Sequence, residues 1–206
     1  MKKLGCLLIY LCLGLSLFAE NLTVESICKK LSENPNTVGD FTQIKNIKSN
    51  GRQLKSSGKF IISDMGIVWE TKKPFGSCVI FTEDKMIQVS NRGKVSVLEG
   101  KDNLMFENIS QTMIAVFSGD DKALDKNFIV NFSSDNNNWT LELTPRDETI
   151  KSVMEKLTLK GKADNEISLD SLEMNESTGN SIKYNFSNQS YPKELSEDEK
   201  KYFSIK

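Results

Sequence analysis

The chain has 206 residues, and its 27 lysine and arginine residues nearly balance 28 aspartate and glutamate residues, which gives a formal net charge of −1. This balance disfavours nucleic acid as a partner, because nucleic-acid-binding domains usually carry a basic patch that neutralises phosphates. The chain contains no histidine. That absence excludes nucleophile pairs and metal sites that depend on an imidazole.

The N-terminus has the organisation of a secretory signal. Two lysines precede an apolar run over residues 4–18, and the small residue Ala19 follows. The run is shorter than the roughly 20 apolar residues that span a bilayer. We therefore predict a cleaved signal peptide over residues 1–19 and a single exported domain over residues 20–206. Cys12 is followed by apolar residues rather than by a polar tether, so a lipid anchor is not expected.

The first predicted element after the signal is an amphipathic helix over residues 23–34. Its apolar positions recur three or four residues apart and are Val24, Ile27, Cys28 and Leu31, and Pro35 follows the segment. After it, apolar and polar residues alternate in short runs that include Phe60 and Ile62, Ile67 and Trp69, Val79 and Phe81, and Ile87 and Val89. Turn-forming segments separate these runs, which predicts an antiparallel sheet of short strands.

Helical spacing returns in the middle of the chain. We predict a helix within residues 108–119, and a further short turn over residues 120–125 that Asp120 caps. Alternation then resumes in a hairpin whose two strands carry Phe128, Val130 and Phe132, and Trp139, Leu141 and Leu143. Further strands are predicted at residues 153–160, 167–174 and 181–186. The middle one should contain a β-bulge, because its alternation shifts between Leu169 and Leu172.

Two cysteines, Cys28 and Cys78, remain after the predicted cleavage. An even number in an oxidising compartment permits one disulfide, and the alternative is two buried thiols that pack as small apolar residues. Their spacing matches no zinc motif, and no glycine-rich phosphate loop follows a strand. The carboxylates at residues 120–121 and 197–199 lie at a helix start and in a charged tail, which is typical of solvated surface. We therefore expect that the protein binds no metal and no cofactor, and that it is not an enzyme.

Large apolar side chains recur on the face of the sheet that the helices are expected to cover. These residues are Phe60, Trp69, Phe81, Phe128, Phe132, Trp139, Tyr184 and Phe186, with Met105 and Met113 near the helical segment. They could form a filled core, because apolar residues are mostly interior. Alternatively, a strongly curved sheet leaves a cavity for an apolar ligand, and methionine-bearing helices form a pliable lid over it.

Several short motifs occur in an order that is typical of one known family. They are Phe41-Thr42-Gln43, Ser57-Gly58-Lys59-Phe60, Trp69 followed by Pro74-Phe75, Gln111-Thr112-Met113-Ile114, Trp139-Thr140-Leu141-Glu142-Leu143-Thr144-Pro145, and Gly179-Asn180-Ser181-Ile182 followed by Tyr184 and Phe186. In order and spacing these motifs resemble the outer-membrane lipoprotein carrier family, the LolA-like proteins. Family members often carry an arginine that latches the lid, where this chain has Ile62-Ser63-Asp64-Met65.

The resemblance implies a mainly β fold with a helical lid, namely an incomplete antiparallel β-barrel of about eleven strands covered by short α-helices. It also implies a monomeric periplasmic carrier. This carrier would take acylated lipoproteins from an inner-membrane lipoprotein-releasing ABC transporter and deliver them to an outer-membrane acceptor. The ligand-binding residues of cavity and lid would be Phe60, Ile62, Trp69, Phe75, Phe81, Met105, Met113, Phe117, Phe128, Phe132, Trp139, Leu141, Tyr184 and Phe186.

A second hypothesis keeps the same fold but changes the role. The chain would then be a periplasmic lipid- or lipoprotein-sensing regulatory binding protein, similar to the periplasmic proteins that bind anti-sigma factors. Those proteins usually carry an additional C-terminal domain, which is not expected within residues 20–206. The carrier is therefore the favoured interpretation.

Overall fold

The computed structural model describes residues 22–82, 85–99, 115, 120–164 and 166–205. The predicted signal peptide lies outside the described residues and stays a prediction. The helix predicted within residues 108–119 lies outside them too, except for Ala115, which is helical and buried.

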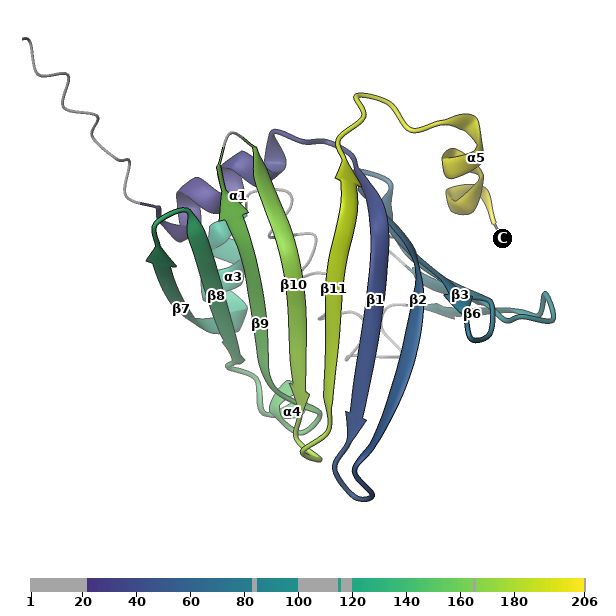
Figure 1. Cartoon of the computed structure of the whole chain (residues 1–206), viewed down its shortest axis with the longest axis horizontal. Helices are drawn as coiled ribbons and strands as arrows, with labels where there is room; N and C mark the ends of the chain where they lie inside the picture. The colour runs from purple at the N-terminus through teal and green to yellow at the C-terminus, as the bar shows by residue number, and fades with distance from the viewer. Residues whose placement is uncertain (1–21, 83–84, 100–114, 116–119, 165, 206) are drawn as a thin grey trace, which may run out of the picture.

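The described strands form one antiparallel sheet of 11 strands in the order β6-β5-β4-β3-β2-β1-β11-β10-β9-β8-β7 (Figure 1). In chain order, the first six strands are β1 (Thr37–Ile47), β2 (Arg52–Ser63), β3 (Gly66–Lys73), β4 (Ser77–Phe81), β5 (Lys85–Val89) and β6 (Val95–Glu99). The others are β7 (Phe128–Asp135), β8 (Asn138–Pro145), β9 (Met154–Ala163), β10 (Ile167–Glu176) and β11 (Ser181–Ser190). Strands β6 and β7 are the two edges, so the sheet does not close. The predicted incomplete antiparallel barrel is confirmed.

Strands β7 to β11 follow the predicted alternation closely. In β8, Trp139, Leu141 and Leu143 are buried and the residues between them are not, and β7 pairs with β8 along the whole predicted hairpin. In β10, Leu169 pairs with Gly161 and Ser171 pairs with Lys160, so Asp170 is the extra residue. The predicted β-bulge is therefore present, and it keeps Leu169 and Leu172 buried on either side of the shift.

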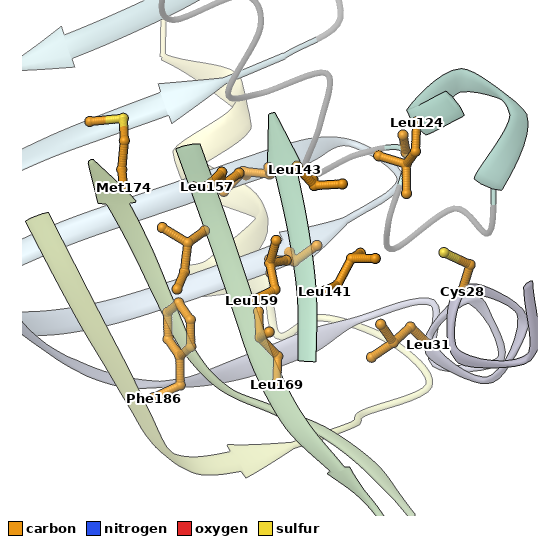
Figure 2. Packing of buried hydrophobic residues seen from close by; sticks show 14 of the residues in the cluster. Cys28, Leu31, Leu124, Leu141, Leu143, Leu157, Leu159, Leu169, Met174 and Phe186 are labelled. Carbon is orange, nitrogen blue, oxygen red and sulfur yellow. The ribbon is translucent and has the colours of Figure 1, made fainter. Parts of the chain in front are cut away.

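Two short helices pack on the concave face of the sheet. Helix α1 (Val24–Ser32) begins with a capping box formed by Thr23 and Ser26, and it buries Ile27, Cys28 and Leu31. Helix α3 (Asp121–Asn127) is capped by Asp120, as predicted, and buries Leu124. Figure 2 shows Cys28, Leu31 and Leu124 facing the strands that carry Leu141 and Leu143. These side chains belong to one core cluster with the inward residues of the sheet.

The convex face of the described sheet carries a buried apolar cluster over strands β2 to β5. There Ile61, Val68, Cys78, Ile80 and Ile87 form a second buried cluster with Leu195 of the C-terminal segment. That segment contains α5 (Glu197–Lys200) and the 3₁₀ helix η2 (Lys201–Ser204), and its Tyr202, Phe203 and Ile205 pack against the cluster. The carboxylates of residues 197–199, expected in a charged tail, belong to α5 instead. This short helix also begins with a capping box, between Ser196 and Glu199. One further helix, α4 (Glu148–Lys151), connects β8 to β9.

Gly161 occupies a position in β9 where the structure leaves no room for a Cβ atom. A Cβ atom built there would lie 1.9 Å from the carbonyl oxygen of Ser168 and 2.5 Å from the ring of Trp139. We expect Gly161→Ala to lower the free energy of unfolding by about 2 kcal/mol, because overpacking of this kind forces the backbone to shift. Chemical denaturation would measure the change.

Gly76 offers a matched control for this substitution. A Cβ atom there would meet nothing closer than the carbonyl oxygen of Thr71, at 4.0 Å. Gly76→Ala should therefore leave the free energy of unfolding almost unchanged. Equal stability losses in both variants would contradict the packing that the structure gives to Gly161.

Candidate ligand cavity

An apolar cavity lies on the concave face of the sheet. Its volume is about 290 Å³, and its walls are formed by Gln43, Trp69, Thr71, Val79, Phe81, Leu157, Leu172, Met174, Ile182 and Tyr184. Strands β3 and β4 supply one wall, and β9, β10 and β11 supply the other. These two sets of strands are separated by β2 and β1 in the sheet. Only the curvature of the sheet brings them to opposite sides of one space.

No charged side chain lines this cavity among the residues that the structure describes. Its polar groups are the amide of Gln43, the hydroxyl of Thr71 and the phenol of Tyr184. Burial raises the pKa of Tyr184 to about 12, so the phenol stays neutral at physiological pH. Ser56 donates a hydrogen bond to Oε1 of Gln43 at 3.0 Å. Such a site favours an uncharged, mostly hydrocarbon ligand.

Aromatic rings reinforce the wall that β1, β3 and β11 share. The ring of Tyr184 lies 5.6 Å from that of Trp69 and 5.7 Å from that of Phe41, in both cases edge to face. The rings of Phe60 and Phe186 are 4.9 Å apart. Each such pair contributes roughly 0.5–1.5 kcal/mol beyond its buried area. These contacts therefore contribute to the stability of this wall.

An ion pair between β1 and β10 lies next to the cavity wall. Lys45 pairs in register with Ile182, a wall residue, and its Nζ lies 2.9 Å from Oε1 of Glu176. Burial alone would raise the pKa of Glu176, but hydrogen bonds donated by Asn180 and Lys45 outweigh burial and lower it. Glu176 therefore stays ionised, and its charge is balanced by Lys45.

The structure brings only part of the predicted site residues to the cavity. Trp69, Phe81 and Tyr184 line it. The others that are described pack in the same concave core without lining the cavity and are Phe60, Ile62, Phe128, Phe132, Trp139, Leu141 and Phe186. Phe75 does not lie in the cavity, because its side chain is 72% exposed in the turn between β3 and β4. Met105, Met113 and Phe117 lie outside the described residues.

The sequence interpretation missed most of the aliphatic and polar wall. The missed residues are Gln43, Thr71, Val79, Leu157, Leu172, Met174 and Ile182. Each lies on the inward parity of its strand, so the alternation that predicted the strands also carried this signal. The sequence interpretation selected the largest aromatic residues as site residues. In the structure these rings mostly fill the interior, whereas the smaller inward side chains beside them leave the cavity open.

The disulfide considered between Cys28 and Cys78 is excluded, since both are free and buried. Cys28 lies on α1 in the concave core, whereas Cys78 lies on β4 in the convex cluster. The sheet separates the two thiols, so the alternative of two buried thiols is confirmed. Burial raises the pKa of Cys28 to about 11 and that of Cys78 to about 12, and nearby carboxylates add to both shifts.

These pKa values predict how the thiols react. The thiolate is the nucleophile, so native Cys28 and Cys78 should react slowly with an aromatic disulfide reagent between pH 7 and 9. The rate should rise only as the pH approaches 11 and 12. In denaturant at pH 8 both should react quickly. Fast labelling of the native protein at pH 8, or no free thiol in denaturant, would contradict the assigned burial.

Metal chemistry finds no support among the described residues, where no three histidine, cysteine, aspartate or glutamate side chains gather as metal ligands. Within that same part of the chain, every helix is too short or too polar to cross a bilayer.

Known proteins resemble this chain in family and in fold. The family model described as Outer membrane lipoprotein carrier protein LolA matches residues 33–205. No curated protein matches the sequence significantly. One similar solved structure is a DUF1329 family protein from Desulfovibrio piger, with 12% identity, a TM-score of 0.50, and coverage of 87% of this chain and 94% of that one. Another is a LolA superfamily protein from Nitrosomonas europaea, with 10% identity, a TM-score of 0.44, and coverage of 86% and 96%. At these identities the likeness concerns the fold alone.

Proposed function

Because the chain belongs to the family of outer membrane lipoprotein carrier proteins, we propose that it carries acylated lipoproteins through the periplasm. The cavity shields the acyl chains after an inner-membrane ABC transporter releases the lipoprotein, and an outer-membrane acceptor then receives it. The observation that supports this proposal is the uncharged, mostly apolar cavity on the concave face.

The energetics of acyl transfer fit such a cavity. Each buried methylene group contributes roughly 0.8 kcal/mol, so an acyl chain cannot cross an aqueous space unshielded without a large cost. The attraction is non-directional, and a carrier that relies on it accepts many lipoproteins.

The volume of the cavity indicates how it is loaded. At about 290 Å³ it is close to the lower end of the roughly 300–1,000 Å³ that is usual for ligand sites. A lipoprotein with several acyl chains needs more room. We propose that α1 and α3, which pack against the concave core at one end, move outward to provide it.

A release assay tests the proposal directly. The mature protein, residues 20–206, would be added to spheroplasts whose inner membrane holds lipoproteins and the releasing transporter. We expect soluble complexes of this protein with lipoproteins in the supernatant, detected by immunoblotting and mass spectrometry. If lipoproteins stay on the membrane and the purified protein binds no acyl ligand, the proposal is wrong.

Filling the cavity should block uptake without unfolding the protein. Val79→Trp places a large ring in the space that Val79 lines, and we expect the affinity for an acyl ligand to fall about tenfold or more. Val130→Trp is the matched control, because Val130 is also half-buried against the concave core but does not line the cavity. Fluorescence titration with an acyl probe would measure both, and thermal melting would compare their stability. Equal affinities in the two variants would contradict the assigned site.

A further inference from the structure

Strand β2 has an edge that no described strand covers. Its pairing with β3 runs from Ser63 only to Ser57, which lies opposite Lys73, whereas its pairing with β1 continues to Arg52. Residues 52–56, the β2 edge, therefore pair with β1 on one side and with no described strand on the other. Figure 1 shows the β1–β2 hairpin extending beyond β3. Such an edge presents main-chain donors and acceptors to an incoming strand.

A groove of about 640 Å³ lies along this edge. It is lined by Thr42, Gln43, Ile44, Lys55, Ser56, Ser57, Lys73 and Pro74. Strand β1 and the β2 edge form its floor, and the end of β3 forms one side. Most of the surface that lines the groove is apolar, so only the open main chain of the β2 edge favours a peptide over a hydrocarbon chain.

The charges around the groove are positive. Arg52, Lys55 and Lys73 are all exposed, and none of them forms an ion pair with another described residue. Glu70 of β3 already faces Lys72, with 3.5 Å between Nζ and Oε2. An extended segment with acidic side chains would therefore be attracted to the β2 edge, and a basic segment would be repelled.

Gln43 connects this groove to the cavity, because it lines both. Its Oε1 accepts a hydrogen bond from Ser56, which belongs to the β2 edge. A ligand whose hydrocarbon part fills the cavity can thus place its polar continuation beside the groove. A lipoprotein has this composition, with acyl chains on its first residue and a polypeptide that follows.

We propose that the β2 edge binds the extended polypeptide that follows the acylated residue of the cargo, as an added antiparallel or parallel strand, with preference for an acidic segment. This inference rests on the proposed carrier function and adds a second subsite to it. Main-chain hydrogen bonds supply the affinity in strand addition. Lysines on an edge strand also discourage pairing between sheets, and the experiment below separates the two roles.

The test uses three synthetic ligands with the same acyl group. One carries no peptide, one carries a ten-residue segment rich in glutamate and serine, and one carries a segment rich in lysine and serine. We expect the acidic lipopeptide to bind about tenfold more tightly than the ligand without a peptide, and the basic one to show no gain. Two N-methylated versions of the acidic lipopeptide, one with the odd-numbered amides blocked and one with the even-numbered amides blocked, test the main-chain hydrogen bonds. Only the version whose blocked amides face the β2 edge should lose the gain of about tenfold in affinity. Hydrogen exchange of the amides in residues 52–56 should slow when the acidic lipopeptide binds.

A charge-reversal pair keeps the test specific to the groove. Lys55→Glu combined with Lys73→Glu should abolish the preference for the acidic lipopeptide while the ligand without a peptide binds as before. Lys162→Glu, on the exposed side of β9, is the control and should change neither. If the ligand without a peptide binds but the acidic peptide adds nothing, the inference is wrong and the carrier stands. If no acyl ligand binds the wild-type protein, the carrier and the inference fail together.

Discussion

A single sheet has two faces, and the fold is stable only if the apolar side chains on both faces are shielded from water. This protein meets the requirement differently on each face. On the concave face, curvature turns the inward side chains of β3 and β4 toward those of β9, β10 and β11, and α1 and α3 close one end. On the convex face, the C-terminal segment covers the apolar part with Leu195, Tyr202, Phe203 and Ile205. Curvature is thus the source of both the core and the cavity.

The two halves of the sheet differ as a result. The outer face of strands β7 to β11 is mostly polar apart from exposed Ile129, and it carries the ion pair between Lys156 and Glu142, at 2.8 Å. Strands β2 to β5 are apolar on both faces, because the C-terminal segment packs outside them. The cavity lies between these halves, with Trp69 and Val79 from one and Leu172 and Met174 from the other.

Local patterns in the sequence were enough to predict the hairpin of β7 and β8, the bulge in β10 and the Asp120 cap, because each depends on nearby periodicity or capping. The convex cover escaped prediction, although runs such as Phe60-Ile61-Ile62 and Ile67-Val68-Trp69 break the alternation and are typical of strands buried on both faces. The separation of Cys28 from Cys78 could not be read from spacing, since it depends on which side of the sheet each element lies. For the cavity, parity identified the inward residues but could not distinguish those that fill the interior from those that leave space.

The cavity and the adjoining groove use two forces that share one property. Burial of hydrocarbon is non-directional, and main-chain hydrogen bonding to an edge strand does not depend on the identity of the partner's side chains. Neither interaction depends on the amino-acid sequence of the ligand, except that the positive charges of Arg52, Lys55 and Lys73 favour a negatively charged segment. Under the proposed function, such a site would recognise a class of molecule, an acyl group joined to an extended peptide, rather than one member of it. That breadth is what the proposed role, the transport of many different lipoproteins, would require.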